Sequence, residues 1–152
     1  MPPVIYAMWT HGHSMQIEHP ERVLNVARFG SHISVEGKPG TDNWFHFAIP
    51  TPVIAHGART FISSVLIEFA TRSTDAIVRH VHVYDGRTKI AEHNDINLSG
   101  NIGLKRFDVA AYPAAQLGVG ISVGVEFGVD PKSHIMDFFA AGCDFGPLLV
   151  HL

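Results

Sequence analysis

Residues 117–128 read Leu-Gly-Val-Gly-Ile-Ser-Val-Gly-Val-Glu-Phe-Gly, and this stretch decides the fold class. Every odd-numbered position from Leu117 to Phe127 is apolar, whereas every even-numbered position is glycine, serine or glutamate. Such alternation predicts a β-strand with one buried face, because successive side chains of a strand point to opposite sides. The opposite face is lined by small residues: Gly118, Gly120, Ser122 and Gly124. We therefore expect close packing there by the opposing sheet, a ligand or another subunit.

The same period of two recurs along the chain. Residues 61–72 and 76–84 alternate in this way, and Asp85-Gly86 then predicts a tight turn into a return strand at 88–92. In these strands we expect Phe61 and Ile77 to face the core. Further strands are predicted at residues 4–10, 15–17, 23–29, 32–35, 43–49, 104–109 and 134–140. Residues 113–117 are expected to form a single helical turn.

About ten short strands separated by turn sequences predict an all-β fold. The favoured architecture is an antiparallel two-sheet sandwich of jelly-roll or immunoglobulin-like type, and a closed barrel is the alternative. The 152 residues suit one domain covering 1–152.

Composition narrows the classes of partner. The formal net charge of −3 argues against nucleic acid and anionic membranes as partners, since both require a basic surface. Charged residues make up 16% of the chain, against about 25% in ordinary domains. This shortage favours a homo-oligomer that hides part of its surface. The single cysteine, Cys143, excludes an internal disulfide and is interpreted as a small buried residue.

The expected location is the cytoplasm. Residues 1–13 lack the basic segment and long apolar run of a signal peptide, and no apolar run approaches the roughly 18 residues of a membrane span.

Eleven histidines are present, and three segments combine them with aromatic residues on the side away from the predicted core. The residues of these segments are Trp9, His11 and His13; Trp44 and His46; and His80, His82 and Tyr84. If the three strands are neighbours in one sheet, these eight side chains form a continuous patch.

One interpretation of the patch is a metal site. His80 and His82 are two apart on a strand, so their rings lie on one side with Cα atoms about 6.5–7 Å apart. They are candidate ligands for zinc, iron, nickel or copper, with His46 or His11 as the third ligand. His11 and His13 form a second such pair. With Glu18 this pair also copies the first half of a cupin metal motif, but no second half follows.

A second interpretation is a binding surface for a small molecule or glycan. Trp9, Trp44 and Tyr84 would supply rigid aromatic contact area, and His46 a polar group beside them. The alternative is that the histidines are tolerated on a hydrated sheet face and that the tryptophans are ordinary core or edge residues.

Two stretches resemble a known group of proteins. "NWFHFAIPTPV" (43–53) and "VHVYDG" (81–86) are similar to a family of small, uncharacterised bacterial β-sandwich proteins of unknown function. The resemblance implies a β-sandwich and a bacterial origin. It implies no reaction and no catalytic residues.

Three functional hypotheses follow. The first is a non-enzymatic β-sandwich module that binds a partner, a small molecule or itself. The second is a small enzyme that uses the histidines of the patch as metal ligands or as acid and base. The third is a structural assembly protein. In each case, protonation of clustered histidines below about pH 6 is expected to weaken binding or assembly.

Overall fold

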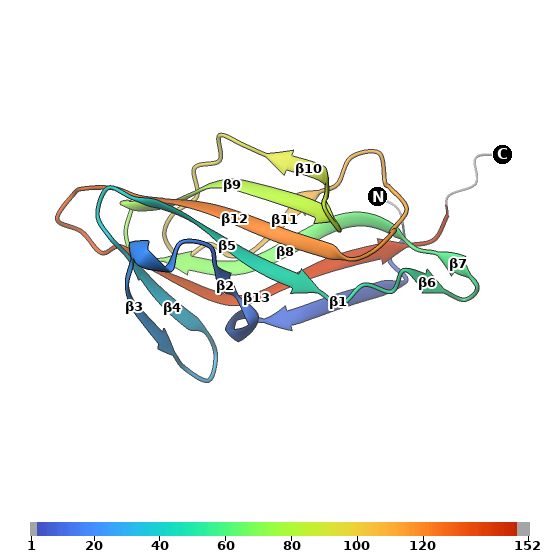
Figure 1. Cartoon of the computed structure of the whole chain (residues 1–152), viewed down its shortest axis with the longest axis horizontal. Helices are drawn as coiled ribbons and strands as arrows, with labels where there is room; N and C mark the ends of the chain where they lie inside the picture. The colour runs from blue at the N-terminus through green and yellow to red at the C-terminus, as the bar shows by residue number, and fades with distance from the viewer. Residues whose placement is uncertain (1–2, 149–152) are drawn as a thin grey trace.

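The computed structural model describes residues 3–148, which form thirteen β-strands and two short 3-10 helices (Figure 1). The strands are β1 (Tyr6–His11), β2 (Gln16–Ile17), β3 (Val23–Arg28), β4 (Ile33–Gly37), β5 (Asp42–Ile49), β6 (Ile54–Ala55), β7 (Ala58–Arg59), β8 (Phe61–Thr71), β9 (Ala76–Asp85), β10 (Thr88–His93), β11 (Gly103–Asp108), β12 (Val119–Phe127) and β13 (Ile135–Gly146). The 3-10 helices are η1 (Gly12–Ser14) and η2 (Pro20–Arg22).

The strands form two antiparallel sheets that pack face to face. Sheet A has the order β11-β8-β13-β4-β3, with β1 also paired to β13, and sheet B has the order β10-β9-β12-β5-β2. Strands β6 and β7 form a separate small hairpin. The predicted antiparallel sandwich is therefore confirmed. Within residues 3–148, no helix is long and apolar enough to cross a membrane.

The core lies between the sheets. The alternating residues of the deciding stretch, from Val119 to Phe127, are buried as predicted. On β5, Phe45 and Phe47 pack against Phe138 of β13, with ring centroids 5.2 and 5.5 Å apart. Burial of each such aromatic side chain contributes about 2–3 kcal/mol to folding. The sandwich thus holds β5 and β12 rigidly, with their other faces turned outward.

A β-bulge corrects the expected orientation at the start of β9. The register with β12 shifts between Gly124 and Val125, so Arg79 is an extra residue on β9. Val78 is consequently buried, whereas Ile77, the predicted core residue, is only partly buried. Bulges add a residue to one strand and redirect the side chains beside it. Here the bulge brings both Arg79 and His80 to the outer face of sheet B.

Other expectations near the strand ends also need correction. Ile62 takes the core position predicted for Phe61, which instead stacks on Tyr112 at a centroid distance of 5.3 Å. Residues 113–117 form no helix, because the carboxylate of Asp85 accepts backbone N–H groups from Gln116, Leu117 and Gly118 and holds the loop extended. Leu117, predicted to face inward, is 75% exposed.

Strand β13 extends six residues beyond the predicted end, through Gly146. Cys143 lies in this extension, and its side chain is buried in the core, as predicted from the sequence. Burial, and to a lesser degree the charge of Asp144, raises the pKa of the Cys143 thiol far above its usual range. The thiol is therefore no nucleophile.

Candidate functional site

The outer face of sheet B has a floor of small residues along its middle strand. Gly120, Ser122 and Gly124 of β12 face outward, with β5 on one side and β9 on the other. Trp44 and His80 are both paired with Gly124, and His46 and His82 are both paired with Ser122. The larger side chains of the flanking strands thus stand beside a low central strand. We call this feature the β12 furrow.

An aromatic wall crosses the furrow at Gly124. The indole of Trp44 stacks on His80 with a centroid distance of 5.6 Å and an interplanar angle of 24°. It also meets His82 at 4.9 Å, tilted by 47°. A Cβ at Gly124 would lie 3.1 Å from atoms of both Trp44 and His80, so glycine is required for the rings to approach each other.

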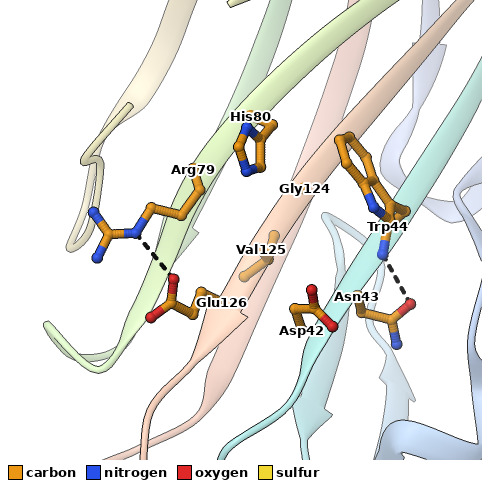
Figure 2. A pocket seen from close by; sticks show the side chains of 8 residues that line it. All are labelled: Asp42, Asn43, Trp44, Arg79, His80, Gly124, Val125 and Glu126. Atoms are coloured by element: carbon orange, nitrogen blue, oxygen red, sulfur yellow. Dashed lines mark hydrogen bonds and ion pairs between the residues drawn. The ribbon is translucent and has the colours of Figure 1, made fainter. Parts of the chain in front are cut away.

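Two depressions lie along the furrow. The first, of about 90 Å³, is lined by charged and polar groups (Figure 2). In it, Arg79 donates from Nε to Glu126 at 3.3 Å, and Asn43 Oδ1 accepts the backbone N–H of Trp44 at 2.9 Å (Figure 2). Its remaining wall is formed by Asp42, His80, Gly124 and Val125.

The second depression has a volume of about 360 Å³, and Trp44 lines it as well. Its other lining residues are Glu18, His46, His82, Tyr84, Lys89 and Ser122. Here His46 hydrogen-bonds Ser122 Oγ through Nδ1 at 2.8 Å and Glu18 Oε1 through Nε2 at 2.7 Å. Since the Glu18 carboxylate can only accept a hydrogen bond, Nε2 carries the hydrogen, and Nδ1 of the neutral ring accepts from the Ser122 hydroxyl.

His80 and His82 meet at one side chain from the loop after β10. Nδ1 of His80 lies 2.8 Å from Asn94 Oδ1, and Nε2 of His82 lies 2.9 Å from the same oxygen. The two rings use opposite nitrogens because their side chains reach Asn94 from different positions along β9. The amide oxygen is thus the shared acceptor of both imidazoles.

An ion pair lies at the rim of the second depression, on β10. Lys89 Nζ lies 2.5 Å from Glu92 Oε2. This hydrogen bond lowers the pKa of Glu92 and raises that of Lys89. The ammonium and carboxylate groups compensate each other, so this part of the rim has little net charge.

Strand order separates the other three members of the predicted patch from this face. Strand β1 is paired with β13 in sheet A, so Trp9, His11 and His13 do not join the residues of β5 and β9. Trp9 is 42% exposed and lies over Gly142, where an added Cβ would be 2.4 Å from the indole ring. His11 Nδ1 accepts the backbone N–H of His13, and His13 Nε2 donates to the carbonyls of Phe29 and His32.

The outer face of sheet A is covered by its own ion pairs. Arg106 donates to Asp144 Oδ2 at 2.7 Å, and both groups contact Ser64. Arg72 donates to both oxygens of Asp137 at 3.1 and 3.2 Å, and this hydrogen bonding raises the pKa of Arg72. The carboxylates of this face are therefore nearly buried beneath guanidinium groups.

The three-histidine arrangement expected for a metal is not formed by the described residues. No three His, Cys, Asp or Glu side chains within residues 3–148 converge on one point. His46 is engaged by Ser122 and Glu18, and His11 lies on the other sheet. Glu18 likewise hydrogen-bonds His46 rather than His11 or His13. The three residues of the partial cupin motif therefore do not form a common metal site. Of the two histidine pairs predicted from the sequence, His80 and His82 converge on a common atom, whereas His11 and His13 do not.

Arg79 and Asn94 were not identified from the sequence as site residues, and Glu18 was considered only together with His11 and His13. Arg79 reaches the furrow through a bulge, and Asn94 and Glu18 come from loops. The sequence signal that pointed to this region was the row of small residues at 118–124. It predicted that some other group packs closely against this face of the strand, but it did not identify that group.

Comparison with known proteins identifies the family. Residues 1–146 match a family of unknown function, DUF6623, and the chain belongs to this family. This confirms the resemblance drawn from residues 43–53 and 81–86 to a family without established function. No curated protein sequence matches the chain.

Two solved structures resemble it at low sequence identity. One is CBM86, described as a low-affinity xylan-binding module from Roseburia intestinalis, with 7% identity, 92% of this chain and 96% of that chain covered, and a TM-score of 0.54. The other is a Stig cyclase, Fisc, from Fischerella sp. TAU, with 9% identity, coverage of 97% and 98%, and the same TM-score. Because one is a binding module and the other a cyclase, the likeness shows the β-sandwich fold alone.

Proposed function

We propose that this member of DUF6623 is a non-enzymatic binding module and that the β12 furrow binds an extended carbohydrate. The observation that carries the proposal is the aromatic wall of Trp44 and His80, which stands between two depressions on the outer face of sheet B. An indole offers rigid apolar area to a sugar ring, and the small residues of β12 leave room for the ligand beside it.

The dimensions and chemistry of the furrow suit a chain of hydroxylated rings. From Gly120 to Glu126 the strand runs about 20 Å, so an extended ligand that passes over Trp44 can reach both depressions. Hydroxyl, imidazole, amide and charged groups line these depressions. Such side chains match the many donors and acceptors of a sugar.

The charge pattern favours a neutral ligand. Arg79 is paired with Glu126, and Lys89 is paired with Glu92, so neither end of the furrow has a strong field of one sign. A polyanion would require unpaired cations. A fold of the same kind in a xylan-binding module supports a neutral polysaccharide as the first ligand to test.

Glycan-array screening followed by calorimetry tests the proposal. We expect one class of neutral oligosaccharide, with xylohexaose as the first compound, to bind at 1:1 stoichiometry. Trp44→Ala should weaken binding at least tenfold, because it removes the central stacking surface. Trp9→Ala is the matched control on the other sheet and should leave the affinity unchanged. Absence of any glycan ligand, or equal loss with both variants, would overturn the proposal.

A second candidate function is a small hydrolytic enzyme, and the hydrogen-bonded chain Ser122–His46–Glu18 favours it. Residues 120–124 also read Gly-Ile-Ser-Val-Gly, the letters of the pattern for a nucleophilic serine. Ser122, however, lies within β12 rather than on a strand-to-helix turn, and pairing with β5 and β9 engages the backbone N–H groups that would form an oxyanion hole. Labelling of Ser122 by a fluorophosphonate, abolished in Glu18→Gln, would favour the enzyme over the binding module.

We also propose that the chain forms a homo-oligomer. Its low charge supports this, as do large apolar side chains that are more than 40% exposed, among them Trp9, Leu104 and Phe29. Light scattering at increasing concentration tests it, and a monomer at all concentrations would contradict it.

A further inference from the structure

We propose that His80, His82 and Asn94 form a binding site for a divalent transition metal ion of the class that prefers imidazole, such as Zn²⁺, Ni²⁺ or Cu²⁺. The site goes beyond glycan binding and does not depend on it.

The geometry of the three donor atoms carries the proposal. Asn94 Oδ1 lies 2.8 Å from one imidazole nitrogen and 2.9 Å from the other. Ligands bound at about 2.1 Å and at right angles around one ion lie about 3.0 Å apart, whereas tetrahedral ligands lie about 3.4 Å apart. The present N–O distances are hydrogen-bond distances and are shorter than either spacing, so the Asn94 oxygen must move outward when an ion enters. Both ring nitrogens point at one position, which the Asn94 oxygen now holds, so an ion bound there keeps the two imidazoles in place while the Asn94 side chain withdraws to become its third ligand.

The surroundings tolerate a cation. Lys89, the ammonium group of the neighbouring strand, is paired with Glu92, and the guanidinium of Arg79 is paired with Glu126. Glu92 lies directly across from His82 in the β9–β10 register. Both histidines are partly exposed, so the remaining coordination positions are open to water or to a ligand in the furrow.

The chain contains a matched control. His11 and His13 have the same sequence spacing, but His13 belongs to η1 and no longer continues the strand. One nitrogen of each ring is already used by the backbone, since His11 Nδ1 accepts the N–H of His13 and His13 Nε2 donates to Phe29. Spacing alone would make the two pairs equal, whereas the geometry predicts metal binding only at His80 and His82.

Titration of the tag-free chain with ZnCl₂ at pH 7.5, followed by calorimetry, tests the site. We expect one ion per chain, and a loss of affinity of at least tenfold in both His80→Ala and His82→Ala. Asn94→Asp should bind more tightly, since a carboxylate is the stronger ligand, and the double variant His11→Ala/His13→Ala should bind as the wild type does. Binding should be lost at pH 5, because protonated imidazole is no ligand.

Ring resonances of the histidines provide a second measurement on the unaltered protein. Zn²⁺ should shift the signals of His80 and His82 and leave those of His11 and His13 in place. No saturable binding, or binding that survives His80→Ala and His82→Ala, would overturn the proposal. Glycan binding is measured separately in the presence of EDTA, so failure of one proposal does not imply failure of the other.

Discussion

The two outer faces of the sandwich each place a tryptophan beside a glycine of the neighbouring strand, and the difference between them is the reason for proposing that the ligand binds on sheet B. On sheet A, Trp9 lies over Gly142, so that the indole fills the space that a Cβ would take. On sheet B, the tip of the Trp44 indole and the His80 ring come together beside Gly124, and a depression lies on each side of Trp44 (Figure 2). The indole of Trp9 therefore covers the surface of sheet A, whereas the indole of Trp44 stands between two depressions.

The charged groups of the two faces also differ in their exposure to solvent. The carboxylates of Asp144 and Asp137 on sheet A are nearly buried beneath Arg106 and Arg72. On sheet B the ion pairs are exposed and lie at the ends of the furrow. Polar groups on sheet A therefore serve stability, whereas those on sheet B are accessible to a ligand.

Removal of one arginine from each face should give the largest contrast. Arg106→Ala leaves the Asp144 carboxylate nearly buried without its cation and should lower the free energy of unfolding by about 2–3 kcal/mol. This is below the roughly 3–5 kcal/mol of a fully buried pair, because Arg106 is partly exposed. Arg79→Ala removes an exposed pair and should cost less than about 1 kcal/mol. Urea denaturation measures both, and equal losses would contradict the distinction.

The two glycines offer a smaller contrast. Gly142→Ala must displace the Trp9 ring and should lower stability by about 1–2 kcal/mol while leaving ligand affinity unchanged. Gly124→Ala should push Trp44 and His80 apart by a few tenths of an ångström, which we expect to lower ligand affinity about threefold to tenfold at a smaller cost in stability. Calorimetry and urea denaturation on both variants separate these effects. The idea fails if Gly142→Ala is the variant that loses affinity.

Acidification should produce the smallest change. The furrow is bordered by three imidazoles, those of His46, His80 and His82, and imidazole is the side-chain type that generally gains charge between pH 7.5 and pH 5. The carboxylates nearest these rings are Glu18, which is paired with His46, and Glu92, which lies across from His82. We expect a loss of a few-fold in affinity for a neutral glycan. A dissociation constant that is the same at both pH values would show that these rings do not border the ligand.

The sequence predicted the orientation of side chains better than the neighbours of each strand. Alternation placed Trp44, His46, His80, His82 and Tyr84 away from the core, and the structure brings these five to the outer face of sheet B. Alternation is a local property, since it follows from the geometry of a single strand. The bulge at Arg79 shows where a prediction from alternation fails. The extra residue reverses which side chains of β9 face the core in the part of the strand that precedes it.

Strand order is a property of the whole chain and could not be read from any one segment. Trp9 belongs to an equally convincing pattern, yet β1 pairs with β13, more than 120 residues later in the sequence. The position of β12 between β5 and β9 likewise depends on how distant segments pack. Asn94 and Glu18 reach the furrow from loops, where no periodicity exists to predict their direction.

Mapping of ligand contacts by NMR on the ¹⁵N-labelled chain tests the central claim most directly. The spectrum is followed during titration with the oligosaccharide that binds best in the array. The account predicts that the indole N–H of Trp44 and the amides of residues 120–126 shift, while the indole of Trp9 and the amides of β1 do not. Shifts centred on Trp9 and β13 would contradict it and would place the binding face on sheet A.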